Sequence, residues 1–201
     1  MNLRNDKGFS LIELISALVL VAILFIMASW GVYAFIVKYQ QLVRYADLQE
    51  EAVAAIETIK HGGPMGDSFN TIFLGVASAD SLQLLNYSYE HGGYRTIKCY
   101  SSKNETAHLN DYVEFYWDPI TGKIKYNSLY GTSFTNAEQI FPQDANDERI
   151  KANKLIFNFY HSNKIVTVDF EAEVRINEAE EEEDIEKRKV NFKTKISSVK
   201  N

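Results

Sequence analysis

Residues 7–37 read K-G-F-S-L-I-E-L-I-S-A-L-V-L-V-A-I-L-F-I-M-A-S-W-G-V-Y-A-F-I-V and contain a single carboxylate, Glu13. After it, residues 14–37 carry no charged side chain. As a helix rising about 1.5 Å per residue, this uncharged run covers roughly 36 Å, more than the hydrocarbon core of a bilayer at about 30 Å. The chain is therefore predicted to cross a membrane once, close to its start.

Two ordinary explanations of such a segment fit these residues poorly. A cleaved secretory signal has a short apolar region followed by a polar mature start, whereas this run continues far beyond that length. A plain single-pass anchor leaves Glu13 unexplained, because a carboxylate inside a spanning helix costs about 2.5–3.5 kcal/mol at mid-bilayer and less near the interface. Arg4 and Lys7 precede the run, which predicts a cytoplasmic N-terminus and an extracytoplasmic C-terminal part.

Residues 7–13, K-G-F-S-L-I-E, resemble the processing site of type IV prepilins and type II secretion pseudopilins. The resemblance implies that a prepilin peptidase cuts between Gly8 and Phe9 and then methylates the amino group of Phe9. A glycine suits the cut because it has no Cβ. The new ammonium would need a carboxylate in an apolar filament core. We expect Glu13 to pair with the Phe9 amine of a neighbouring subunit, because Glu13 cannot easily fold back on its own helix start.

Two departures from the major pilins favour a minor subunit. Where major pilins commonly have a proline, this chain has Trp30 followed by Gly31, so that bending or melting over residues 29–31 would depend on the glycine. The chain has one cysteine, Cys99, so that no intrachain disulfide closes a C-terminal loop. The resemblance is closest to the larger minor subunits, such as a J-type pseudopilin or a PilW-like minor pilin.

The helix is predicted to continue to residue 61 with an amphipathic outer half over residues 38–61. Its apolar stripe includes Val53, Ile56 and Ile59, with Ala52 and Ala55 alongside. Residues 61–64, H-G-G-P, end it. A coiled coil is the alternative for this half. The predicted organisation is a leader over residues 1–8, a membrane or filament-core segment over 9–37, the amphipathic half over 38–61 and a globular domain over 62–201.

The globular domain is predicted to be an antiparallel β-sheet, because hairpin signals recur and no βαβ spacing occurs. The strand signals cover residues 81–89, 94–100, 112–117, 123–129, 155–160, 164–174 and 190–199, with turns at 91–93, 118–122 and 161–163. Residues 65–80 are predicted to be irregular. The fold class is therefore α+β, a long helix with an antiparallel sheet packed against its outer half, and the resemblance implies the pilin fold.

No catalytic motif or cofactor site is recognised in the sequence. The four histidines fall at predicted turns or element ends without metal-ligand spacing: His61, His91, His108 and His161. The acidic run over residues 178–186 is interpreted as a solvated loop or a docking surface, with a calcium site at Glu180, Glu182 and Asp184 as the sharper alternative. The net charge of −6 argues against direct nucleic-acid binding.

The sequence therefore predicts a structural subunit, not an enzyme, that is matured by prepilin peptidase and assembled into a type II secretion pseudopilus or a type IV pilus, near its tip. The implied partners are the peptidase, other pilin or pseudopilin subunits and, indirectly, the assembly platform and its ATPase. The expected location is the cytoplasmic membrane and then the filament. Two alternatives stay open: a membrane-anchored extracytoplasmic binding domain outside any filament, and a competence pseudopilus subunit for DNA uptake.

Overall fold

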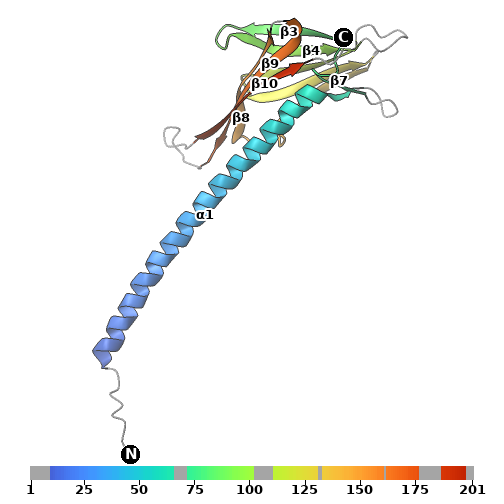
Figure 1. Ribbon diagram of the computed structural model, residues 1–201. Coiled ribbons are helices and arrows are strands. Elements are labelled where there is room, and N and C mark those ends of the chain that lie inside the picture. The colour runs from blue at the N-terminus through green and yellow to red at the C-terminus, as the bar shows by residue number, and fades with distance from the viewer. Residues whose placement is uncertain are drawn as a thin grey trace, which may run out of the picture. The chain divides into compact units, whose positions relative to one another are not determined.

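A computed structural model describes residues 10–65, 72–101, 111–130, 133–160, 162–176 and 187–197 (Figure 1). The chain divides into two compact units, Met1–Val43 and Arg44–Asn201. Each unit is described by itself.

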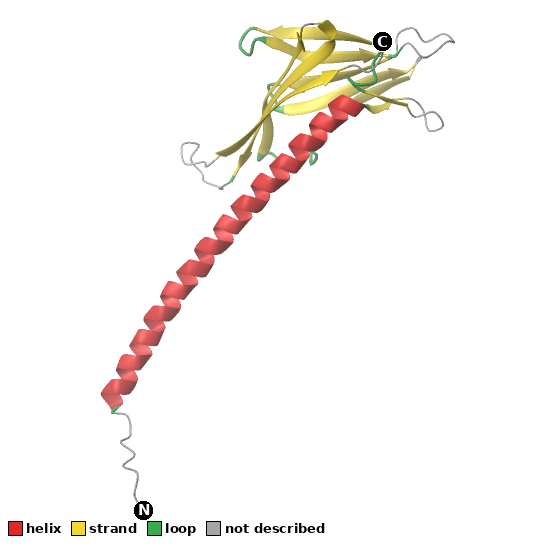
Figure 2. Cartoon of the chain, viewed as in Figure 1, coloured by secondary structure: helices red, strands yellow, loops and turns green. Residues whose placement is uncertain are grey.

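The helix α1 runs from Leu11 to His61 without interruption and is drawn in red in Figure 2. The helix is continuous through Trp30 and Gly31, so the local melting that the sequence left open at residues 29–31 is absent from this structure. The predicted end is confirmed: Gly62 has a φ of 116°, and its N–H donates to the Thr58 carbonyl at 2.8 Å. A Cβ at Gly62 would lie 2.3 Å from the backbone carbon of Leu74, so glycine is required here for space as well as for conformation.

Ten strands follow in the described part of the chain: β1 (Gly63–Met65), β2 (Ile72–Leu74), β3 (Ser81–Ser88), β4 (Gly93–Tyr100), β5 (Tyr112–Asp118), β6 (Lys123–Tyr130), β7 (Ser133–Phe141), β8 (Ile150–Tyr160), β9 (Ser162–Arg175) and β10 (Lys187–Ser197). Eight of these form one antiparallel sheet in the order β10-β9-β8-β4-β5-β6-β7, with β3 also paired to β4. The α+β architecture of a pilin fold, a long N-terminal helix with an antiparallel sheet, is confirmed.

Within the second unit, the last part of α1 supplies one wall of the core. Leu48, Ala52, Ala55 and Ile59 are fully or almost fully buried, at the spacing of one helix face, and they belong to the same apolar cluster as Phe115. The predicted stripe was partly wrong. Val53 is 47% exposed, whereas Leu48, which the stripe left out, is completely buried. Ala52 and Ala55 have small side chains, which let the helix approach the sheet closely. The face of α1 that carries them is therefore the buried one.

The predicted hairpins β3–β4, β5–β6 and β8–β9 are confirmed. The irregular stretch predicted for residues 65–80 was partly wrong, because β1 and β2 pair there as a small separate sheet. Strand β7 was not predicted at all. The β8 strand starts at Ile150, before the predicted residue 155, and β10 starts at Lys187, before the predicted residue 190. A register shift between Ala152 and Lys154 interrupts the alternation of buried and exposed residues in the first part of β8. The sequence pattern of a strand is therefore weak over these residues.

The large sheet divides at β4. Pairing between β4 and β5 extends from Tyr100↔Tyr112 to Thr96↔Tyr116, and next to it β4 pairs with β8 at Tyr94↔Phe157. The pairing between β4 and β5 therefore ends before Arg95, and β8 is the neighbour of β4 beyond it. The indole N–H of Trp117 donates to the Ala152 carbonyl of β8 at 3.2 Å, which holds the end of β5 beside its new neighbour.

Candidate functional site

The described part of the chain begins with a capped helix start. The Ser10 N–H and hydroxyl both donate to Glu13 Oε2, at 2.9 and 3.1 Å, and the Glu13 N–H donates to Ser10 Oγ at 3.3 Å. The Leu14 N–H donates to the Ser10 carbonyl at 3.1 Å and starts the helical ladder. This reciprocal arrangement is a capping box, in which a serine and a glutamate three residues apart satisfy N–H groups that lack helical partners.

The expectation that Glu13 cannot fold back on its own helix start was wrong. The side chain reaches Ser10 from the first turn of an intact helix, because positions N-cap and N3 lie within reach of each other. All three contacts leave Glu13 Oε1 without a hydrogen bond to any described residue. One carboxylate oxygen therefore stabilises the helix start, while the other is open to an external donor.

The helical segment beyond the cap is apolar, and no other described residue of its unit packs over it. Its large apolar side chains over residues 11–36 are exposed, from 46% at Ile23 to 76% at Trp30. The two serine hydroxyls inside this run donate back to the helix: Ser16 Oγ to the Ile12 carbonyl at 2.7 Å and Ser29 Oγ to the Phe25 carbonyl at 2.8 Å. Polar groups satisfied in this way do not demand water. By length and composition, α1 is long and apolar enough to cross a membrane.

The remaining predicted site residues are placed only in part. Gly8 and Phe9 lie outside the described residues, as do the three carboxylates of the possible calcium site, Glu180, Glu182 and Asp184. Among the residues that the structure describes, no group of three or more histidine, cysteine, aspartate or glutamate side chains could hold a metal ion.

The two described histidines have different surroundings. His61 Nε2 lies 2.9 Å from Glu57 Oε2 in the last turn of α1, and the His91 ring lies 5.6 Å from the Trp117 ring. His108 and His161 lie outside the described residues. Cys99 is fully buried in the sheet, and burial raises the pKa of its thiol. Among the residues that the structure describes, His61, His91 and Cys99 belong to no cluster that could hold a metal ion.

The role of Ser10 was missed in the sequence, although the signal was present. S-L-I-E over residues 10–13 is a capping-box pattern immediately before an apolar run. The physical consequence is that Ser10 and Glu13 form one structural pair.

Comparison with known proteins gave one match. Residues 3–29 match the family model described as the prokaryotic N-terminal methylation motif. No curated protein and no solved structure matches the chain. The match confirms the prepilin-type motif predicted from residues 7–13, and it runs from residue 3 through the capping box into the first part of the apolar helix.

Proposed function

We propose that this chain, which carries the prepilin-type N-terminal methylation motif of the type IV pilin and pseudopilin family, is a minor subunit of a type II secretion pseudopilus or a type IV pilus. The observation that carries the proposal is the continuity of this motif with a long helix whose apolar side chains are exposed over residues 11–36. Such a surface needs either lipid or other helices around it.

The proposed path begins in the cytoplasmic membrane. The chain inserts once, with residues 1–8 as a cytoplasmic leader and the β domain outside, and prepilin peptidase removes the leader between Gly8 and Phe9 and methylates Phe9. Residues 9–37 then exchange lipid for the helices of other subunits. This exchange is physically reasonable because lipid tails and apolar helix surfaces offer similar surroundings, so that packing between helices drives the transfer.

In the filament, Glu13 is proposed to bind the Phe9 ammonium of a neighbouring subunit. The open Oε1 supports this role, because pairing with a neighbour does not require Glu13 to release Ser10. An ammonium in an apolar helix bundle without a carboxylate partner is strongly unfavourable. The pairing would therefore set the axial position at which one subunit docks on the next.

The assignment as a minor subunit is supported by the same features that separate the chain from major pilins. Trp30 stands where the major pilins commonly have proline, and α1 is unbroken there. The single cysteine allows no disulfide-closed loop. We propose a position near the filament tip, with other subunits as direct partners and the assembly platform and ATPase as indirect ones.

The experiment that tests this proposal is intact mass and N-terminal sequencing of the full chain, purified from a host with prepilin peptidase and from a peptidase-deficient host. We expect a chain that starts at Phe9 with one added methyl group in the first host, and a chain that starts at Met1 in the second. A Gly8→Val variant, which places a branched side chain at the cut, is the matched control and should stay unprocessed. A start at Met1 in both hosts would contradict maturation and favour an anchored domain outside any filament.

A further inference from the structure

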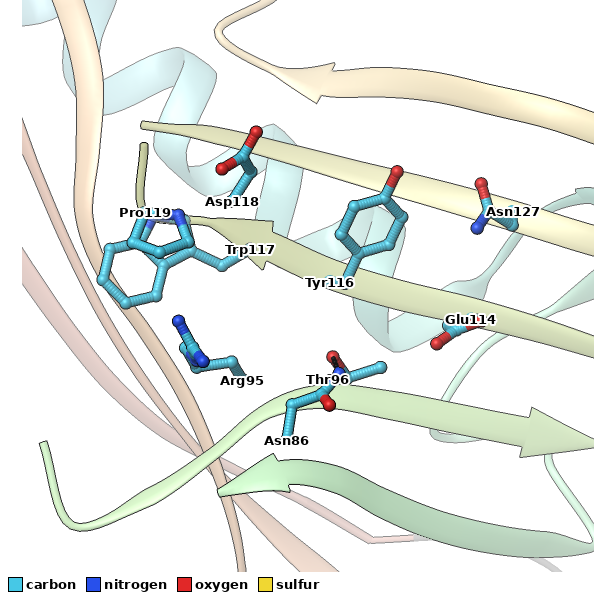
Figure 3. A pocket seen from close by; sticks show the side chains of 9 residues that line it. All are labelled: Asn86, Arg95, Thr96, Glu114, Tyr116, Trp117, Asp118, Pro119 and Asn127. Atoms are coloured by element: carbon cyan, nitrogen blue, oxygen red, sulfur yellow. Dashed lines mark hydrogen bonds between the residues drawn. The ribbon is translucent and has the colours of Figure 1, made fainter. Parts of the chain in front are cut away.

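Strand β3 is an open edge of the large sheet. In the described part of the chain it pairs with β4 alone, along Ser81–Ser88. The other side of β4 is occupied by β5 (Figure 3), because Thr96 pairs with Leu85 of β3 and also with Tyr116 of β5. The outer edge of β3 therefore presents backbone N–H and C=O groups to which another strand can bond.

This edge lacks the features that usually keep a sheet edge from pairing with another chain. Those features are charged side chains, prolines and bulges. The strand reads S-L-Q-L-L-N-Y-S, without a charge or a proline. The edge strand β7 pairs with β6 through two register shifts. The edge strand β10 carries five cationic side chains: Lys187, Arg188, Lys189, Lys193 and Lys195.

The regular part of the β3 edge ends at Asn86. The backbone of Asn86 has a positive φ of 58°, and its Nδ2 donates to Thr96 Oγ1 on β4 at 2.9 Å (Figure 3). The pairing with β4 continues on both sides of Asn86 but skips this residue. Residues 81–85 are therefore the stretch that a second strand can join in a regular ladder.

Two leucines of this stretch lie at the rim of the core. Leu82 and Leu84 are half-buried and pack against the apolar cluster. Their partners on β4, Cys99 and Ile97, are completely buried. A strand beside β3 would cover the surface that the two leucines still expose, and the burial of apolar surface favours association.

The residue between the leucines is exposed on the opposite face. Gln83 Oε1 accepts a hydrogen bond from the Tyr100 hydroxyl at 2.8 Å. An amide both donates and accepts, so a second glutamine directly opposite is a complementary partner. Lys98, which pairs with Gln83 on β4, lies 3.5 Å from Glu114 of β5. Its charge is therefore balanced on the side away from the open edge.

We propose that a second copy of this chain binds this edge, with the two β3 strands antiparallel and Gln83 of each copy directly opposite Gln83 of the other. This register places Leu82 of one copy opposite Leu84 of the other, so the four leucines extend one apolar face. The order Leu82-Gln83-Leu84 reads the same in both directions, as a twofold interface requires.

Neighbouring registers are worse. With Leu84 on the twofold axis, Leu82 would lie opposite the irregular Asn86. With Leu82 on the axis, Leu84 would lie opposite the charged Asp80. The register centred on Gln83 is therefore the one that the side chains select.

Other occupants fit this edge less well. Lipid does not, because hydrocarbon offers no partner to backbone groups. A charged peptide finds no opposite charge on β3, whereas a second copy brings the same uncharged edge. Five paired residues bury less than a standard interface of about 1,600 Å², so the dimer should be weak and concentration-dependent. The inference concerns the β domain, goes beyond the proposed filament role and does not depend on it.

The first test is disulfide cross-linking of the full chain in detergent micelles, with Cys99, which is buried, left in place. Opposite residues of an antiparallel pair have Cα atoms about 4.5–5.5 Å apart, within the range of a disulfide. After copper–phenanthroline oxidation, Gln83→Cys should give a disulfide-linked dimer. Asn191→Cys, at an exposed position of β10, is the matched control and should stay monomeric. No dimer from Gln83→Cys, or equal yields from both variants, would overturn the proposal.

The second test is sedimentation equilibrium in density-matched micelles, with near-ultraviolet circular dichroism to show that each variant is folded. Gln83→Lys should raise the Kd of the dimer about fivefold or more, because two ammonium groups then lie directly opposite each other. An equimolar mixture of Gln83→Lys and Gln83→Glu should associate at least as tightly as the wild-type chain. Asn191→Lys adds the same charge on β10 and should leave the Kd unchanged.

The mixture separates this interface from association elsewhere in the chain. A dimer formed through α1 would be insensitive to the charge at residue 83. A wild-type chain that stays monomeric at every concentration, a Kd that Gln83→Lys does not change, or a Lys and Glu mixture no tighter than Gln83→Lys alone would each overturn the proposal.

Discussion

Replacing Glu13 by glutamine separates the two roles assigned to its two carboxylate oxygens. The glutamine amide oxygen can still accept the bonds from Ser10, because a capping box accepts either residue at this position. The other oxygen becomes an NH₂ group, which cannot accept a hydrogen bond from an ammonium. Glu13→Gln should therefore preserve the helix start and remove the proposed contact with a neighbour's Phe9.

The magnitudes of the two effects differ enough to be distinguished. Loss of an N-cap costs about 0.5–2 kcal/mol. Removal of one partner from a buried charge pair costs about 3–5 kcal/mol, because the remaining charge is left unpaired. The Glu13→Gln subunit should thus be depleted from filaments by roughly two to four powers of ten. Ser10→Ala, which loses the hydroxyl contacts at 3.1 and 3.3 Å but keeps the carboxylate, should be depleted by about thirtyfold at most.

The assay is quantitative immunoblotting of sheared filaments and of the membrane fraction, in a host that expresses the complete filament machinery. Both variants should reach the membrane in wild-type amounts, because insertion depends on the uncharged helix. If Glu13→Gln enters filaments as well as the wild-type chain does, the pairing is refuted. If Ser10→Ala is depleted as strongly as Glu13→Gln, the cap explains the requirement for Glu13 and no neighbour is needed.

Three further predictions concern the β domain in the full chain, with unfolding followed by near-ultraviolet circular dichroism. Leu48→Ala should lower the free energy of unfolding by about 2–5 kcal/mol, because Leu48 is completely buried; a loss below 1 kcal/mol, measured by urea titration, would contradict its place in the core. Glu173 is largely buried, yet hydrogen bonds from Asn153 at 2.7 Å and from Lys151 keep its pKa below the ordinary value of 4.5. The contribution of the Glu173 carboxylate to stability is therefore present above pH 4.5 and is lost as the pH falls through the lowered pKa. The stability advantage of the wild-type chain over Glu173→Gln should accordingly shrink below about pH 4.5, and an advantage that does not change with pH in thermal melts would refute this assignment. Gly62→Ala should lower the melting temperature markedly, because the new Cβ would meet the β2 backbone at 2.3 Å, and an unchanged melt would show that this turn can shift without cost.

The sequence predicts those parts of the fold in which a local rule and the tertiary structure agree. The α1 helix ends at His61 because the glycines that follow cannot continue it well, and the β5–β6 turn forms because Asp118 bonds to the Ile120 N–H and to Thr121. Both boundaries depend on neighbours in the chain. They were therefore readable from residue types alone.

The missed strand β7 has a different origin. It pairs with β6 through two register shifts, between Ile124 and Lys125 and between Tyr126 and Ser128, so its alternation of polar and apolar residues is irregular. Strand β7 lies at the edge of the sheet and is held there by its pairing with β6. A window of sequence that excludes β6 contains no sign of this partner.

The helix start could be predicted only in part. Glu13 stands out in the sequence as the single carboxylate of residues 7–37. Its bonds to Ser10 follow from S-L-I-E over residues 10–13, a local capping-box pattern that was present in the sequence and was missed.

The burial of Cys99 has a practical consequence for mapping how subunits meet. Its side chain has no exposed surface, and burial keeps the thiol protonated by raising its pKa, so it should not react with maleimides in the folded chain. The natural chain can therefore serve directly as the unreactive background for cysteine cross-linking. Single cysteines introduced along α1 would report their own neighbours, without prior removal of a residue that the core needs.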